Sequence, residues 1–189
     1  MKIMVLDNYD SFTYNLVHIL KELTREPVDV YRNDEIALSD IERYDKIIVS
    51  PGPGVPDDAG ITKQLISHFA PVKSILGVCL GCQAITEVFG GSLINLDSVY
   101  HGVKTKIIVT DAGDKLFHDV PANFEAGRYH SWVVNETDLP SCLTVTARDD
   151  EGLIMALSHT RYALKGVQFH PESVMTEYGK KILHNWLEI

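Results

Sequence analysis

The sequence has few cysteines, no long hydrophobic run and no membrane-targeting segment. Its three cysteines, Cys79, Cys82 and Cys142, are too few and odd in number for a disulfide framework, so we expect a reducing, cytoplasmic environment. The longest uncharged run, Ser74–Thr86, is interrupted by glycines and is shorter than the roughly 20 apolar residues of a membrane span. The first residues reach the acidic Asp7 before a signal peptide's hydrophobic segment can form.

Positive charge is also scarce. The 26 acidic and 17 basic residues leave a net charge of −9, which argues against nucleic acid or an anionic membrane as a partner. Apolar residues make up 45% and charged residues 23% of the 189 residues, close to the average of globular proteins. Without a repeat, a low-complexity tract or a linker-like stretch, the sequence predicts one domain over residues 1–189.

Short apolar runs and amphipathic segments alternate in the first half of the chain. We expect helices at residues 11–23, 61–69 and 80–89 and strands at Lys2–Leu6, Val28–Arg32, Lys46–Val49 and Ser74–Val78. This alternation is typical of crossover units and predicts a mostly parallel sheet.

The second half has a different pattern. Strands are expected at Thr105–Thr110, Leu143–Arg148, Ile154–His159 and Leu164–Phe169. The last three have no helix-length segment between them, so hairpin connections and antiparallel pairing are expected there. Residues 178–187 place an apolar stripe on one helical face and predict a helix packed on the sheet. The fold class predicted is an α/β sandwich with an antiparallel annex.

Four polar or reactive segments follow predicted strands: Asn8–Asp10, Pro51–Gly54, Cys79 and His170. Ligands of parallel α/β sheets bind beyond the carboxyl ends of the strands. We therefore expect these segments to meet at one edge of the sheet and to form a joint active site.

The segment Gly77-Val78-Cys79-Leu80-Gly81 has the form of a nucleophile elbow between a strand and a helix. The flanking glycines relieve crowding around the tight turn, and the helix N-terminus favours a thiolate at Cys79. An isolated cysteine is more often a small buried apolar residue, but this context favours a nucleophile. Cys79 and Cys82 also form a Cys-x-x-Cys pattern, which leaves a thiol redox protein as an alternative; otherwise Cys82 is a core residue.

The segment Gly166–Glu172 contains a candidate base. Pro171 favours an extended conformation for His170, and residues two apart on an extended chain face the same side. Glu172 would then lie beside His170 and orient its imidazole, as the acid of a catalytic triad does. Surface His-x-Glu pairs are common, so this interpretation depends on the elbow at Cys79.

The Pro51–Gly54 loop offers few backbone donors on a stiff turn, and we expect it to present N–H groups to an oxyanion together with Leu80 N–H. An ordinary rigid turn is the alternative. No metal site is predicted, because the remaining histidines are scattered: His18, His68, His101, His118, His130, His159 and His184. No Walker-type phosphate loop and no dinucleotide fingerprint occurs.

With these motifs in view, the whole chain resembles the class I (triad) glutamine amidotransferases. The matching motifs are Ser50–Gly54, Gly77–Gln83 and Val167–Glu172, in the order found in that family. The opening Asp7–Asn15 resembles most the glutaminase components of anthranilate synthase and of aminodeoxychorismate synthase. The resemblance implies a three-layer, flavodoxin-like sandwich with a mostly parallel open sheet and a small antiparallel annex.

The resemblance also implies roles for individual residues. Cys79 would be the nucleophile, His170 the acid and base, and Glu172 the group that orients His170. Glutamine and the oxyanion would be bound by residues of the loop, the elbow helix and a later segment: Gly52, Pro53, Gly54, Leu80, Gln83, Ser131 and Trp132. Relatives often have leucine in place of Trp132, which leaves a role for its side chain open.

The expected reaction is hydrolysis of L-glutamine to glutamate, with no cofactor in this subunit. The ammonia would pass to a separate synthase subunit that uses chorismate, because 189 residues leave no room for a synthase domain. Anthranilate for tryptophan synthesis is the expected product. Aminodeoxychorismate for folate synthesis, or service to both synthases, is the alternative. A hydrolase or peptidase with the same triad is a further alternative.

Overall fold

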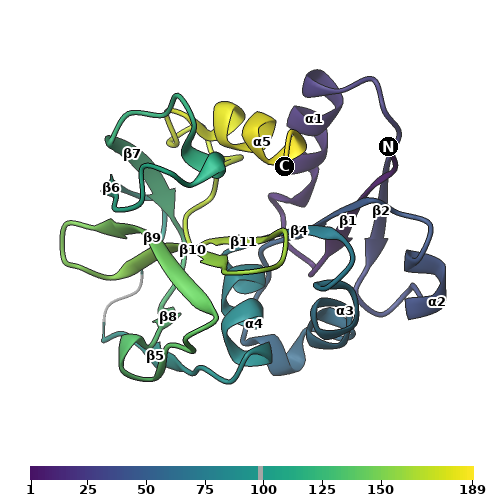
Figure 1. Ribbon diagram of the computed structural model, residues 1–189, viewed down its shortest axis with the longest axis horizontal. Helices are drawn as coiled ribbons and strands as arrows, with labels where there is room; N and C mark the ends of the chain where they lie inside the picture. The colour runs from purple at the N-terminus through teal and green to yellow at the C-terminus, as the bar shows by residue number, and fades with distance from the viewer. Residues whose placement is uncertain (98–99) are drawn as a thin grey trace.

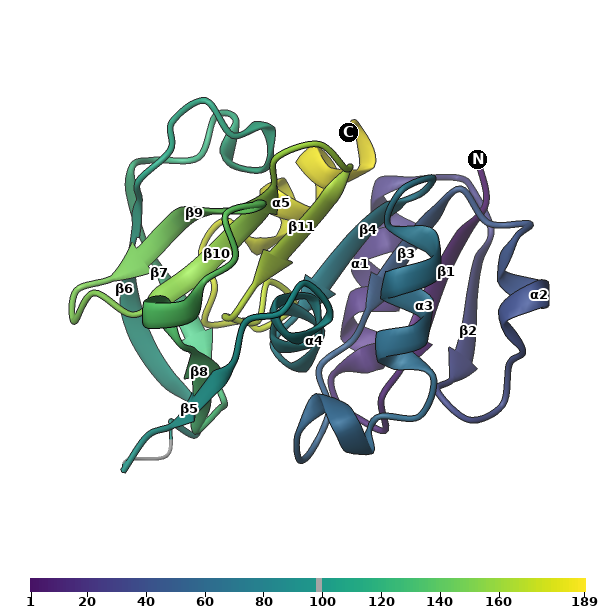
Figure 2. The same cartoon turned by 60° about the horizontal axis from the view of Figure 1, so that its bottom comes forward.

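The computed structural model describes residues 1–97 and 100–189. Helices cover both faces of one twisted sheet (Figures 1 and 2). The first half contains β1 (Ile3–Asp7), α1 (Thr13–Leu23), β2 (Val28–Arg32), α2 (Leu38–Ile41), β3 (Lys46–Val49), α3 (Thr62–Phe69), β4 (Ser74–Val78) and α4 (Leu80–Val88). The second half contains β5 (Leu93–Asn95), β6 (Val103–Val109), β7 (Asn123–Arg128), β8 (Trp132–Val134), β9 (Leu143–Asp149), β10 (Ile154–His159), β11 (Leu164–Val167) and α5 (Gly179–Leu187).

The large sheet has the strand order β2-β1-β3-β4-β11-β10-β9-β6-β7. Its first five strands are parallel, and the last four continue the same sheet with antiparallel pairing. Strands β5 and β8 form a separate antiparallel pair. The predicted fold class is confirmed. The predicted antiparallel annex is for the most part a continuation of the parallel sheet.

Two hydrophobic cores lie on opposite faces of the sheet and make the three layers visible in Figure 1. On one face, α1 and α5 bury residues such as Leu16, Leu20 and Trp186. On the other face, α3 and α4 bury residues such as Leu65 and Ile85. These residues recur at the three- and four-residue spacing that places side chains on one side of a helix. The periodicity in the sequence therefore predicted the long helices correctly.

Among the α-helices and strands of the described residues, four were not predicted: α2, β5, β7 and β8. Helix α2 has four residues, and β5 and β8 have three each. Strand β7 is longer, but its sequence Asn-Phe-Glu-Ala-Gly-Arg has Phe124 as its only large apolar side chain. An edge strand of this kind is held by backbone hydrogen bonds to its neighbour β6 more than by an apolar face. Its sequence therefore carries little of the pattern by which strands are recognised.

The order of the strands brings distant segments together. Strands β4 and β11 are parallel neighbours, with Gly77 paired with Gly166 and Val78 paired with Val167. Strand β3 lies on the other side of β4, and β1 lies beyond β3. The chain segments that follow β1, β3, β4 and β11 therefore leave the sheet at the same edge. Within the described ranges, no helix has both the length and the apolar character needed to cross a membrane.

Candidate active site

The turn between β4 and α4 has the geometry of a nucleophile elbow. Cys79 has φ 51° and ψ −103°, in a region that non-glycine residues rarely adopt. Its N–H donates to Val167 O at 2.8 Å, which ties the elbow to the end of β11. A Cβ at Gly77 would overlap the backbone of Gly81, and a Cβ at Gly81 would overlap Val49 O. The two glycines therefore allow the strand and the helix to approach closely enough to form the turn.

Cys79 lines a pocket of about 320 Å³ although only 5% of the residue is exposed. Six residues predicted from the sequence line the same pocket: Gly52, Pro53, Gly54, Gln83, Ser131 and Trp132. Four further residues that were not predicted complete it: Tyr100, His101, Tyr129 and His130. Leu80, predicted as an oxyanion donor, is buried and does not line the pocket with its side chain. Its N–H belongs to the first residue of α4 and so has no partner within the helix.

His170 is buried, and its Nδ1 lies 2.6 Å from Glu172 Oε1. The two residues meet across a turn, in which Ser173 N–H donates to His170 O at 3.2 Å. The expectation of an extended chain from His170 to Glu172 is therefore wrong, although the expected proximity is found. Pro171 stands at the second position of this turn, where its fixed φ is favourable.

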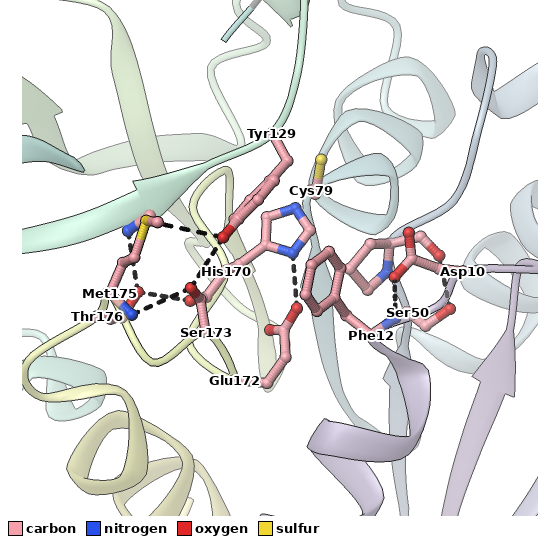
Figure 3. Close-up of polar contacts among 12 residues, drawn as sticks. Asp10, Phe12, Ser50, Cys79, Tyr129, His170, Glu172, Ser173, Met175 and Thr176 are labelled. Carbon is pink, nitrogen blue, oxygen red and sulfur yellow. Dashed lines mark hydrogen bonds and ion pairs between the residues drawn. The ribbon is translucent and has the colours of Figure 1, made fainter. Parts of the chain in front are cut away.

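The imidazole of His170 packs against two aromatic rings (Figure 3). Its ring centroid lies 4.8 Å from that of Tyr129 and 5.7 Å from that of Phe12, both in edge-on arrangements. The rings of Phe12 and Tyr129 also contact each other, with centroids 5.0 Å apart. Figure 3 shows one ring nitrogen of His170 directed at Glu172 and the other at Cys79. This second nitrogen, Nε2, is buried and has no hydrogen-bond partner among the described residues.

The surroundings of His170 favour its protonated form. Burial by itself lowers the pKa of His170, but the nearby Cys79 and Glu172 outweigh burial and raise that pKa to about 10. An imidazolium at this position stabilises a thiolate beside it. The geometry thus provides a nucleophilic sulfur, a proton carrier and an acid that orients the carrier.

The Pro51–Gly54 loop is attached to the core through Asn8. Asn8 N–H donates to Ser50 Oγ and Asn8 Nδ2 donates to Ser50 O, both at 2.9 Å. Asn8 Oδ1 accepts hydrogen bonds from Asn33 Nδ2 at 3.0 Å and from Thr62 Oγ1 at 2.8 Å. All four side chains are buried, so this network determines where the loop leaves the sheet.

Gln83 and the segment around Trp132 form the far wall of the pocket. Gln83 Nε2 donates to Trp132 O at 2.9 Å and to Gln168 Oε1 at 3.2 Å. The interaction with Trp132 uses its backbone carbonyl, which any residue at this position possesses. The contact therefore does not depend on the tryptophan side chain.

A buried charged group lies behind this wall. Arg128 forms an ion pair with Asp149 at 2.6 Å, and both side chains are completely buried. Its guanidinium also lies 3.6 Å from the ring centroid of Tyr100. Arg128 Nε donates to His130 Nε2 at 3.1 Å. Burial, and then the charge of Arg128, lower the pKa of His130 to about 3, so His130 is neutral at physiological pH.

Cys82 does not line the pocket. It is completely buried in the core under β4 and β11, and a Cβ at Gly166 would touch its Sγ. Burial raises the pKa of the Cys82 thiol. Cys79 and Cys82 are both free cysteines, and of the two only Cys79 lines the pocket.

Residues 1–97 and 100–189 contain no group of three or more His, Cys, Asp or Glu side chains able to hold a metal ion. A wider hollow of about 740 Å³ lies over α3 and α4 and contains none of the predicted site residues. The sequence does not predict Tyr129 and His130 as pocket residues, because they precede Ser131 without forming a recognisable motif. Helical periodicity places Phe12 on an apolar face but does not predict its contact with His170.

Three comparisons relate this chain to known proteins. The model of the family described as "Glutamine amidotransferase class-I" matches residues 4–189. The aminodeoxychorismate/anthranilate synthase component 2 of Bacillus subtilis is 50% identical over 188 residues, 98% of this chain and 95% of that protein. The anthranilate synthase component 2 of Azospirillum brasilense is 46% identical over 188 residues, 98% of this chain and 94% of that protein.

Among solved structures, a putative GMP synthase protein from Thermoplasma acidophilum superimposes with a TM-score of 0.89 at 27% identity. The match covers 100% of this chain and 92% of that one. The similarity therefore extends over the whole architecture, including β4 and β11.

Proposed function

Because this chain belongs to the class I glutamine amidotransferase family, we propose that it is the glutaminase subunit of a chorismate-using synthase. It hydrolyses L-glutamine to glutamate and delivers the ammonia to a separate synthase subunit, which makes anthranilate. The observation that carries this proposal is the position of Cys79. Its sulfur lies at a strained elbow, beside an imidazole held by Glu172, in the wall of a pocket that has the predicted glutamine-site residues.

The first step is attack of the Cys79 thiolate on the carboxamide carbon of glutamine. The carbonyl oxygen becomes an oxyanion, for which the N–H groups of Leu80 and of the Gly52 region are the proposed donors. Leu80 N–H is suited to this because it stands at the N-terminus of α4, where the helix dipole favours negative charge.

His170 carries the proton through both halves of the reaction. Its protonated Nε2 faces Cys79. This nitrogen transfers its proton to the departing ammonia as the carbon–nitrogen bond breaks, which leaves a γ-glutamyl thioester. Neutral His170 then takes a proton from water, which attacks the thioester carbon and releases glutamate and the thiolate. Glu172 keeps the imidazole oriented and stabilises its charged form.

Gln83, Ser131, Trp132 and the Pro51–Gly54 loop bind the substrate in this proposal. Both N–H bonds of the Gln83 amide are directed at protein acceptors, so its Oε1 remains to accept a hydrogen bond from glutamine. The pocket volume of about 320 Å³ suits a substrate of amino-acid size.

A partner subunit follows from the chemistry of ammonia. In bulk water near neutral pH ammonia is converted to ammonium, which is not a nucleophile. A synthase that covers the pocket and conducts ammonia to its own active site avoids this loss. We propose such a synthase as the partner, and aminodeoxychorismate as a second product, because the Bacillus relative is named for both synthases.

The test compares Cys79→Ala with a Cys142→Ala control in complex with each synthase subunit. Cys79→Ala should abolish synthesis from chorismate and glutamine and leave synthesis from chorismate and ammonium salts intact. Cys142→Ala should leave both intact. If Cys79→Ala still hydrolyses glutamine, the assignment of Cys79 as the nucleophile is refuted. If the wild type cleaves peptides and not glutamine, the assignment of glutamine as the substrate is refuted. The synthase that supports turnover identifies the product.

A further inference from the structure

One buried side chain beside Cys79 has no task in the reaction described above. Gln168 follows β11 directly and is completely buried. Its Nε2 lies 3.5 Å from Cys79 Sγ, within the distance of a hydrogen bond to sulfur. The two residues are 89 positions apart in the sequence, and only the pairing of β4 with β11 brings them together.

Neighbouring groups determine which end of the Gln168 amide faces the sulfur. A backbone carbonyl such as Trp132 O can only accept hydrogen bonds, so the NH₂ group of Gln83 must be the end that faces it. The same NH₂ group donates to Gln168 at 3.2 Å. The Gln168 oxygen therefore faces Gln83, and the Gln168 NH₂ group must point to Cys79 Sγ.

A second hydrogen-bonded chain meets the first at the same carbonyl. His130 Nδ1 lies 3.0 Å from Trp132 O, and His130 Nε2 accepts from Arg128 Nε at 3.1 Å. Arginine can only donate, so Nε2 of His130 carries no proton and Nδ1 carries the one donated to Trp132 O. The low pKa of His130 agrees with this neutral tautomer. Arg128 is itself held by Asp149 at 2.6 Å. A buried ion pair thus supports the carbonyl that orients Gln83 and Gln168.

Resting on the proposed glutaminase function, we propose that Gln168 is a further catalytic residue, whose carboxamide N–H donates a hydrogen bond to Cys79 Sγ and stabilises the thiolate. Hydrogen bonds to an ionised acceptor are stronger than those to a neutral one, so this donor favours the anionic sulfur over the thiol. The sulfur is anionic before attack and again when the thioester is hydrolysed. Gln168 therefore assists both the preparation of the nucleophile and its departure.

The other titratable groups around Cys79 stay in place when Gln168 is replaced. They are His170 with Glu172 behind it, Cys82 one turn along α4, and Tyr100, His101, Tyr129 and His130 in the pocket wall. The Gln168 amide does not titrate itself. A change in the titration of Cys79 on replacing Gln168 is then attributable to the missing N–H.

The test measures the rate of alkylation of Cys79 by iodoacetamide against pH, in a Cys142→Ser background and with the alkylated residue identified by mass spectrometry. Gln168→Met keeps the length of the side chain and removes the N–H. We expect the pH midpoint of alkylation to rise by roughly one to two units, the effect of losing a hydrogen bond to a charged group. In complex with the synthase, kcat for glutamine should fall roughly tenfold or more while KM changes less.

Two further variants separate this role from a structural one. Gln168→Glu keeps the oxygen that faces Gln83 but places a carboxylate oxygen next to the sulfur, so the midpoint should rise further than in Gln168→Met. Gln64→Met, an exposed glutamine on α3, should change nothing. If Gln168→Met does not fold, the alkylation midpoint of Gln168→Glu tests the proposal in its place. A lower melting temperature with an unchanged alkylation midpoint would show that Gln168 only packs, and would overturn the proposal.

The alkylation experiment does not use glutamine and is therefore independent of the proposed function. If the wild type hydrolyses glutamine and the midpoint does not move in the Gln168 variants, this inference fails and the glutaminase function stands. If the midpoint moves but the wild-type complex shows no glutamine hydrolysis, the thiolate contact stands and the proposed function, with the catalytic role of Gln168 in it, fails.

Discussion

His170 Nδ1 lies 2.6 Å from Glu172 Oε1 across a turn that contains Pro171, and both side chains are almost completely removed from solvent. A buried carboxylate at this distance favours the imidazolium over the neutral ring. It works against burial, which favours the neutral ring. The relationship therefore orients the ring and, together with Cys79, sets the pH range over which the ring holds its proton.

Glu172→Gln should lower kcat for glutamine roughly 100-fold and shift the alkaline limb of the pH profile to lower pH. Without the carboxylate, the pKa of His170 falls from about 10 toward its ordinary value, so the imidazolium is lost earlier as the pH rises. The measurement is kcat between pH 6 and 10 for the complex, with Glu35→Gln on the exposed surface as control. An unshifted alkaline limb in Glu172→Gln would contradict this assignment.

The same pair affects folding stability. The folded-state pKa of His170 is raised, so its contribution is complete below the unfolded pKa of about 6.5 and is lost as the pH rises toward 10. The wild type should therefore lose more free energy of unfolding between pH 7 and 9 than Glu172→Gln does. Urea unfolding at both pH values measures the difference, and equal losses would contradict it.

Gly179→Ala should destabilise the protein by roughly 2–3 kcal/mol and lower kcat. A Cβ at this first residue of α5 would overlap the carbonyl oxygen of Pro171, a backbone atom in the turn that holds His170 and Glu172. Gly113→Ala is the matched control, because the nearest atom to a Cβ there is the Asp111 carboxylate at 3.3 Å. Chemical denaturation and steady-state kinetics check both variants. Equal stability of the two would show that the helix moves away from the turn without cost.

Asn8→Ala should cost roughly 2–4 kcal/mol of stability, because it leaves buried hydrogen-bonding groups of Ser50, Asn33 and Thr62 without their partner. It should also lower kcat, since the Pro51–Gly54 loop is attached to the core through this side chain. The exposed Asn123→Ala on β7 should change neither quantity. A stable, fully active Asn8→Ala protein would show that the network does not position the loop.

Cys82→Ala should leave glutamine-dependent synthesis close to the wild-type level and cost about 1 kcal/mol in stability, for the small cavity that it leaves. Cys82 is completely buried and does not line the pocket. A thiol redox protein that used Cys79 with Cys82 would lose its activity in this variant. Kinetics of the complex together with a dithiol–disulfide assay distinguish the two. Loss of activity in a folded Cys82→Ala protein would favour the redox alternative.

Much of this protein is determined locally. The apolar periodicity predicted every long helix and most strands, because side chains that share a face recur at a spacing set by the backbone itself. The elbow is local as well, since Gly77, Cys79 and Gly81 are close in sequence. So is the order of strand and helix, from which the meeting of four strand ends at one edge of the sheet was predicted.

Only the tertiary structure determines the contacts of atoms that no sequence pattern identifies. The carbonyl of Trp132 orients Gln83, and Gln83 orients Gln168, yet a backbone carbonyl is common to all residues and Gln168 lies 85 positions from Gln83. The turn at Pro171, in place of an extended chain, lies against the first residue of α5, Gly179, a contact between segments that no local pattern indicates. Short-range patterns specify elements and their order, whereas the partners of each buried polar atom are set only when the strands have taken their places beside one another.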